Sequence, residues 1–320
     1  MEIEFFLLRR QTDPIDARDI GQPSAPPRVG PIDPGYQFLS EVRLAGLSAI
    51  LDPLRDALHG VGLAPRTFEQ EWGPAQVEVS FSPLRGLEAA DAAVLFRTAT
   101  KQVAAQQGVL ATFMSWPALP SLPSSGWHLH QSLTAGVDGP NAFASDSELL
   151  SPLGRQFAAG ILAHARPMTV FTTPTVTGFK RFRPYSFAPD NVNWALENRG
   201  AMLRVQGGPG DPGTHLENRL GEPSANPYLY LAANIAAGLD GIRRRLEPPA
   251  FATPDPYQSG GERLPQSLGE AAEALDGDTF FRQALGSTVV DYLVQMKRAE
   301  WRRFLGAVTD WEMREYLEFF

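Results

Sequence analysis

The sequence predicts an α+β fold, and three patterns lead to this prediction. Alternating polar and apolar residues, typical of strands, occur at the N-terminus and at 75–83 and 126–133. Long stretches with helical periodicity lie at 86–108 and 226–246. The strands are scattered between helices without a regular strand–helix alternation, so a βαβ array of parallel strands is not expected.

The individual elements follow from local patterns. A strand opens the chain, because Glu2 and Glu4 alternate with apolar residues. Pro, Asp and Gly predict a loop from Thr12 to Gly35. Apolar spacing and turn residues then predict helices at 40–60, 86–108, 152–166 and 226–246, one or two helices at 279–308, strands at 75–83, 110–117, 126–133 and 201–205, and a flexible loop at 206–214.

Composition narrows the classes of function. The net charge of −8 disfavours a broad surface for nucleic acid or anionic membranes, so bound phosphate would need metal ions or a few placed arginines. The absence of cysteine excludes disulfides, thiolate metal sites and cysteine nucleophiles. The sequence has no apolar run of ~18 residues and no signal-peptide pattern at its start, so we expect a cytoplasmic protein.

Two of the five histidines stand two residues apart in the segment Gly126–Leu133. On a strand this spacing directs both side chains to one face of the sheet. Taken alone, His128 and His130 fit polar residues on a solvated face better than metal ligands or catalytic bases. The acidic residues elsewhere in the chain bear on this choice.

Glutamates recur in or beside the predicted strands. Any one of them alone fits an ordinary solvated surface, but several converging carboxylates would repel one another unless divalent cations balanced them. Oxygen ligands with a single imidazole suit Mg²⁺ or Mn²⁺ better than zinc. The candidates are Glu2, Glu4, Glu71, Glu78 and Glu217.

The segment 178–205 is rich in basic residues, and Arg219 follows closely. Arginines clamp carboxylates with two hydrogen bonds and stabilise a transferring phosphoryl group. The alternative is a set of surface salt bridges. The residues concerned are Lys180, Arg181, Arg183, Arg199, Arg204 and Arg219. Together with the acids they indicate a metal-dependent enzyme that handles phosphate and carboxylate.

At these motifs the sequence resembles the glutamine synthetase family, in its bacterial type I branch. The resemblance is carried by "EIEFFLL", "QEWGPAQVEVSF", "ATFMSWP…GWHLHQSL", "FKRFRP…APDNVNWALENRGAMLRV" and "LENRLGEPSANPYLYLAANIAAGLDGI". It implies one catalytic domain over residues 1–320, with a curved antiparallel sheet flanked by helices. The family's N-terminal β-grasp domain is expected to be absent from this chain, which begins at the catalytic domain's opening strand. The family's active sites lie between subunits, which implies a homo-oligomer.

The resemblance also implies roles for individual residues. One metal site would comprise Glu4, Glu71 and Glu78, and the other Glu2, His128 and Glu217. His130 and Ser132 would face ATP, Arg199 and Arg204 would meet its phosphates and the transferred phosphoryl group, and Arg181 and Arg219 would hold glutamate. Arg181 and Arg199 are the expected catalytic residues. Two departures are His215, where the family usually has a phosphate-binding arginine, and "PSSGW", where a glycine-rich turn is usual.

The implied chemistry is phosphorylation of the glutamate γ-carboxylate by ATP, followed by attack of an amine on the γ-glutamyl phosphate. Ammonia-using members have a flap glutamate that binds ammonium, whereas here Phe187 occupies that position, or one close to it. An apolar ring favours a larger organic amine, as in γ-glutamylamide or γ-glutamylpolyamine synthetases. The alternatives are glutamine synthesis itself, or a non-catalytic scaffold or truncated chain.

Overall fold

The computed structural model describes residues 1–11, 20–21, 26–119, 123–252 and 254–320, so much of the expected loop at 12–35 lies outside the described residues. The strands are β1 (Glu2–Arg10), β2 (Val29–Pro31), β3 (Pro65–Gln70), β4 (Gln76–Phe81), β5 (Val109–Thr112), β6 (Trp127–Gln131), β7 (Trp194–Leu196), β8 (Leu203–Gln206) and β9 (His215–Asn218). The helices are α1 (Glu41–Gly46), α2 (Ser48–Gly60), α3 (Leu87–Gln106), α4 (Pro152–Ala163), α5 (Ala165–Thr172), α6 (Pro227–Arg244), α7 (Leu268–Asp276), α8 (Thr279–Leu285), α9 (Ser287–Leu305) and α10 (Asp310–Tyr316).

One sheet runs through the molecule in the order β3-β4-β1-β6-β9-β8-β7, and β2 and β5 also pair with β1. Its pairs are antiparallel except β7–β8, which is parallel. The α+β prediction is therefore confirmed, with a mixed sheet in place of a purely antiparallel one. β2 is a short strand within the segment expected to be loop, because it pairs with the end of β1.

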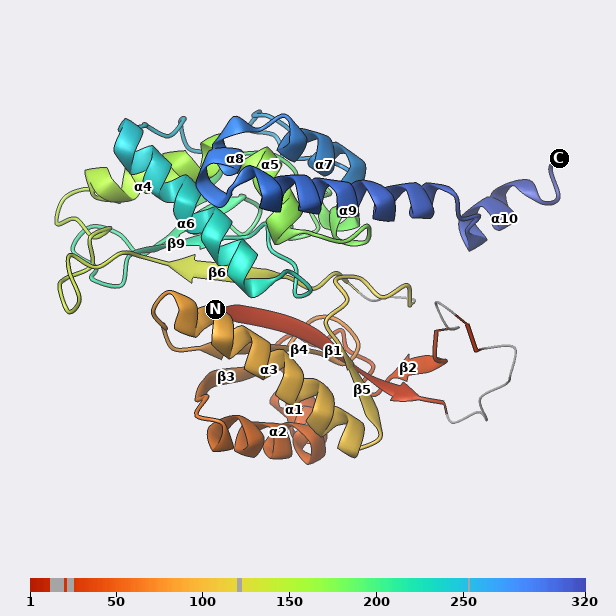
Figure 1. Ribbon diagram of the computed structural model, residues 1–320. Coiled ribbons are helices and arrows are strands. Elements are labelled where there is room, and N and C mark those ends of the chain that lie inside the picture. The colour runs from red at the N-terminus through yellow and green to blue at the C-terminus, as the bar shows by residue number, and fades with distance from the viewer. Residues whose placement is uncertain (12–19, 22–25, 120–122, 253) are drawn as a thin grey trace.

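Helices gather beside the sheet in two groups. Figure 1 shows α1, α2 and α3 next to β1 and β3–β5, and α4–α9 next to β6 and β9, with α10 extending away from the body. Each group closes a hydrophobic core, one containing Phe5, Val79 and Phe96, the other Phe157, Leu203 and Leu216. Among the described residues no helix is long and apolar enough to span a membrane.

The helix at 152–166 was predicted as one element, but it divides at His164 into α4 and α5. Ser151 caps α4 by accepting a hydrogen bond from the Gly154 amide at 3.1 Å. α4 also packs closely on α6, because a Cβ on Gly160 would lie 2.1 Å from the Ala237 carbonyl oxygen. Glycine at this position therefore brings the two backbones together.

Strand alternation separates the core from the site. Trp127 and Leu129 of β6 point into the core, and so do Leu203 and Val205 of β8. The residues between them belong to the opposite face of the sheet. That face carries the polar side chains of β1, β4, β6, β8 and β9: Glu2, Glu4, Glu78, His128, His130, Arg204, Gln206, His215 and Glu217.

Candidate active site

The strand register sets two glutamates directly against each other. Glu4 of β1 lies opposite Glu78 of β4, and both side chains are buried. Gln76 donates a hydrogen bond to Glu4 Oε2 at 2.7 Å. Glu71 follows β3 and accepts a hydrogen bond from the Trp72 amide at 3.3 Å. A like-charged cross-strand pair is destabilising, so these carboxylates need protons or cations to coexist.

The pKa values express this repulsion. Burial, followed by the charges of Glu71 and Glu2, raises the pKa of Glu4 to about 8. Burial, together with the charges of Glu2, Glu4 and Glu71, raises the pKa of Glu78 to about 11. Burial also raises the pKa of Glu71. At neutral pH the group therefore keeps protons that a divalent cation would displace.

Both histidines of β6 contact the same carboxylate. His128 Nδ1 lies 2.6 Å from Glu2 Oε1, and His130 Nε2 lies 2.9 Å from Glu2 Oε2. Burial alone would raise the pKa of Glu2, but these imidazoles hold it well below its usual value. Burial lowers the pKa of His128. The pair thus belongs to a buried polar cluster and not to a solvated face.

Glu217, on β9, is a carboxylate of the opposite kind. It is fully buried, pairs with Arg219, and accepts a hydrogen bond from Arg204 Nη1 at 3.1 Å. Burial would raise its pKa, but Arg219 and the two histidines lower it. Its negative charge is therefore balanced by the protein itself.

Two groups of side chains within the described residues offer ligand atoms close enough to share a cation. One is Glu2, Glu78 and His128, and the other is Glu2, His130 and Glu217. The sequence prediction divided the ligands differently, with Glu4 and Glu71 beside Glu78 and with His128 beside Glu217. The structure brings all six predicted ligands into one region, with Glu2 common to both groups and His130 added.

The predicted substrate residues surround this region. Arg181 is buried and donates from Nη1 to the Leu220 carbonyl oxygen at 3.3 Å, while its Nε has no hydrogen-bond partner among the described residues. Arg199 is exposed, and its charge offsets part of the burial that raises the pKa of Glu71. Ser132 is exposed just beyond β6. Phe187 is 64% exposed, and its carbonyl oxygen accepts a hydrogen bond from Arg219 Nη2 at 3.2 Å.

Gln206 is a site residue that the sequence interpretation missed. Its carboxamide lies 3.0 Å from both His130 Nδ1 and His215 Nε2 and 3.1–3.2 Å from the Arg204 guanidinium. With its oxygen toward Arg204 it accepts from the arginine and donates to both imidazoles. Strand alternation was the available signal, because Gln206 stands two residues after Arg204 and so shares its face.

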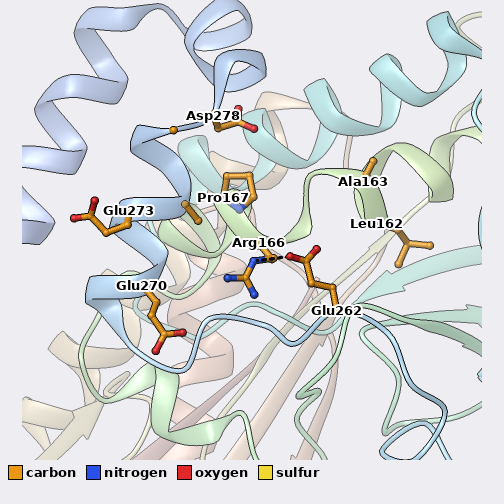
Figure 2. A pocket seen from close by; sticks show the side chains of 10 residues that line it. Leu162, Ala163, Arg166, Pro167, Glu262, Glu270, Glu273 and Asp278 are labelled. Atoms are coloured by element: carbon orange, nitrogen blue, oxygen red, sulfur yellow. Dashed lines mark ion pairs between the residues drawn. The ribbon is translucent and has the colours of Figure 1, made fainter.

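A surface pocket of about 600 Å³ lies elsewhere, beside α4, α5 and α7. Figure 2 shows Arg166 paired with Glu262 in it, at 3.1 Å, with Glu270, Glu273 and Asp278 around them. The residues that line this pocket include none of the predicted site residues. The candidate site is therefore the polar sheet face and not this pocket.

Comparisons with known proteins agree with this fold. The chain is 41% identical over 333 aligned positions to a γ-glutamylanilide synthase of Acinetobacter sp, which covers 99% of this chain and 66% of that protein. It is 38% identical to a glutamine synthetase of Pyrococcus furiosus, over 80% of this chain and 61% of that protein. The chain thus spans less than two thirds of the length of these relatives.

Solved structures give the same result. The structure described as apo GmaS without ligand superposes with a TM-score of 0.82 at 31% identity, covering 99% of this chain and 71% of that one. A GmaS/ADP complex superposes with a TM-score of 0.83 at 30% identity. The family profile described as glutamine synthetase, catalytic domain, matches residues 1–316, so the chain belongs to the glutamine synthetase family and carries its catalytic domain.

Proposed function

We propose that the protein is an ATP-dependent ligase that joins the γ-carboxylate of glutamate to an organic amine and releases ADP and phosphate. The observation that carries this proposal is the polar face of the sheet, where carboxylates that repel one another lie beside a cluster of arginines and histidines. The family membership supports the same chemistry. The GmaS/ADP complex among its structural relatives supports nucleotide use.

We infer that Mg²⁺ or Mn²⁺ binds at two positions. The donor set fits these ions, because carboxylate oxygens predominate and because burial, together with the charges of neighbouring carboxylates, raises the pKa values of Glu4 and Glu78. The proposed ligands are Glu2, Glu4, Glu71, Glu78, His128 and Glu217. His130 lies beside them, in one group with Glu2 and Glu217. Such ions, when bound, would offset the charge of the phosphates and of the reacting carboxylate.

The remaining residues would bind and orient the substrates. Arg181 and Arg219 would hold glutamate, and Arg199 and Arg204 would lie along the ATP phosphates with His130 and Ser132. The glutamate γ-carboxylate oxygen attacks the γ-phosphorus, and ADP leaves. The amine nitrogen then attacks the acyl carbon, phosphate leaves, and the nitrogen loses a proton. Exclusion of water protects the acyl phosphate from hydrolysis.

The proposal of an organic amine rests on Phe187. Its side chain is exposed, its backbone carbonyl accepts a hydrogen bond from Arg219, and no acid lies between Lys180 and Pro189 to bind an ammonium ion. An amine that is neutral at pH 7 needs no such acid before attack. The Acinetobacter relative is named for an anilide, the amide of an aromatic amine, which supports this choice of substrate class.

The test measures ADP release with glutamate and a panel of amines that differ in basicity and size. We expect aniline-type amines to be preferred over ammonia, and Phe187→Glu to shift the preference toward ammonia and methylamine by creating a cation site. Tyr292→Glu, at an exposed aromatic residue of α9 outside the proposed site, is the matched control. If ammonia is the best substrate and Phe187→Glu changes nothing, the protein makes glutamine instead.

We further propose that residues 1–320 act as one catalytic unit within a cytoplasmic homo-oligomer. The continuous sheet between the two hydrophobic cores supports a single unit. Large exposed apolar side chains of the C-terminal segment, among them Trp311, Leu317 and Phe319, support assembly. Sedimentation of the purified chain would test it, because a monomer at micromolar concentration contradicts the proposal.

A further inference from the structure

We propose that Tyr257 is a positioning residue that holds the turn Tyr185–Ala188, and with it the Phe187 side chain, beside Arg219, and so sets which amine the site accepts. The amine part of this inference rests on the proposed function. The structural part rests on contacts within the described residues alone.

The turn has a backbone that needs external support. Tyr185 and Phe187 each have a φ of +60°, in the left-handed region that bulky residues rarely adopt. Such conformations persist only where the surrounding structure holds them. The Phe187 side chain contributes little to this, since it is 64% exposed, whereas the Tyr185 hydroxyl donates to Asp255 Oδ2 at 2.9 Å. The support must therefore come from contacts made to the turn by other segments.

Those contacts come from two sides. Arg219 Nη2 donates to the Phe187 carbonyl oxygen at 3.2 Å, on the side of the candidate site. The Tyr257 hydroxyl donates to the Ala188 carbonyl oxygen at 3.2 Å. Two successive carbonyl groups are thus held by one arginine and one tyrosine. The rings of Tyr185 and Tyr257 also lie 4.9 Å apart.

Tyr257 is itself well anchored. Its ring lies so close to Gly200 that a Cβ there would sit 2.9 Å from Cε2. Its amide donates to Asp255 Oδ1 at 2.9 Å, and Asn193 Nδ2 donates to the adjacent Pro256 carbonyl oxygen at 2.8 Å. Burial raises the pKa of the Tyr257 phenol to about 12, so the hydroxyl stays a donor at physiological pH.

This anchoring links the turn to the rest of the site. Gly200 follows Arg199, so one aromatic ring contacts both the turn that presents Phe187 and the segment that carries a proposed phosphate-binding arginine. Phe187 has no side-chain anchor of its own and takes its position from the backbone of the turn. If the Tyr257 hydroxyl is lost, the ring of Phe187 should sample more positions and discriminate less between amines.

The experiment uses Tyr257→Phe, which removes the hydroxyl and keeps the ring. Hydrogen exchange followed by mass spectrometry on peptides covering 182–190 should accelerate by about three- to ten-fold, the value of one neutral hydrogen bond. In ADP-release assays the KM for aniline should rise by a similar factor, while the KM for ATP should stay within about two-fold. Tyr292→Phe, at an exposed tyrosine of α9, should change neither.

Gly200→Ala provides an independent variant, because it displaces the ring while keeping the hydroxyl, and it should accelerate exchange in the same peptides. Unchanged exchange at 182–190 in Tyr257→Phe overturns the positioning role. Faster exchange with an unchanged aniline-to-ammonia ratio overturns the role in amine choice. If the parent protein releases ADP with none of the amines tested, the proposed function fails. The exchange result alone then still upholds or overturns the positioning of the turn.

Discussion

Two cross-strand pairs on the same sheet face contrast in charge. Glu4 and Glu78 stand opposite each other on β1 and β4, where like charges meet. Arg204 and Glu217 stand opposite each other on β8 and β9, where opposite charges meet. Glu78 and Glu217 are both buried, yet the pKa of Glu78 is raised and the pKa of Glu217 is lowered. The neighbouring charges, and not burial, decide the difference.

The contrast teaches which carboxylates keep their negative charge before a metal ion binds. Around Glu217 the protein supplies its own cations, so this carboxylate stays charged in the metal-free protein. Around Glu4 and Glu78 the Gln76 amide, the Gly126 backbone and the charge of Arg181 do not offset burial and the charges of Glu2 and Glu71, so protons or metal ions must complete the balance. Perturbed carboxyl groups clustered on one face are typical of functional sites. The same substitution should therefore have opposite effects at the two ends of the sheet.

The largest effect is expected from neutralising Glu217, whose negative charge the neighbouring arginines balance. Glu217→Gln should lower the free energy of unfolding of the metal-free protein by about 3–5 kcal/mol at pH 7, because it leaves Arg219 buried without its carboxylate and removes one of the two carboxylates that pair with Arg204. Denaturation in urea would measure it. Glu78→Gln is the matched control, since it makes the same chemical change in the like-charged pair. Equal losses in both variants would contradict the contrast.

Metal binding should give the next largest effect. Millimolar Mn²⁺ should stabilise the protein by about 2.7 kcal/mol for each site at a hundred-fold excess over Kd, because cations relieve repulsion in the folded state. The gain should increase with pH as Glu4 and Glu78 lose their protons. Calorimetric scans with and without metal would record it as a rise in Tm.

The double variant Glu78→Gln with His128→Ala serves as the control for metal binding. It should lose about half of the stabilisation, since both residues belong to one of the two groups that could hold a cation and the other group stays intact. A parent protein whose Tm ignores millimolar metal would show that the carboxylates are balanced by protons alone.

Sequence patterns predicted most of this fold where periodicity was long. The helices at 86–108 and 226–246 and the strands carrying Glu2, Glu78 and His128 are confirmed. β3, β7 and β9 were missed, because three- to six-residue strands carry too little alternation to stand out from loops.

For the site, sequence patterns predicted the candidate residues but not which of them contact one another. Alternation could place His128 and His130 on one face, yet only strand register brings both to Glu2. Gln206 and Tyr257 were missed, because neither residue type indicates a site until register and a distant loop bring it to the polar face. The expected roles of the individual site residues remain predictions.

The pH dependence of stability in the metal-free protein should distinguish the two regions again. The folded-state pKa of Glu78, about 11, lies above the usual value of 4.5, so its contribution to stability is complete below pH 4.5 and is lost as pH rises through 11. Glu78→Gln should therefore stabilise the metal-free protein at pH 8, on the order of 2 kcal/mol, and have little effect at pH 4.

Glu217 has the opposite sign, because its lowered pKa gives stability that is present above 4.5 and is lost as pH falls through the folded-state value. Urea denaturation of Glu78→Gln and Glu217→Gln between pH 4 and 8 would test both. Parallel profiles for the two variants would mean that burial alone governs these carboxylates.

The smallest expected effect concerns the balanced end of the sheet. His215 Nε2 lies 3.0 Å from His130 Nδ1, and burial lowers the pKa of His215, so this position contributes no charge at pH 8.

His215→Arg would add a cation where we propose the ATP phosphates to lie. It should tighten nucleotide binding by about 1 kcal/mol, roughly five-fold, through a charge-assisted hydrogen bond. The same cation should slightly destabilise the nucleotide-free protein, because it adds to the positive charges of Arg204 and Arg219 beside Glu217. Calorimetric titration with ATP and Mn²⁺ would measure the affinity, and His59→Arg, at an exposed histidine on α2, makes the same charge change away from the site. Equal affinity gains in both variants would indicate general electrostatic attraction, and no gain at His215 would place the phosphates away from β9.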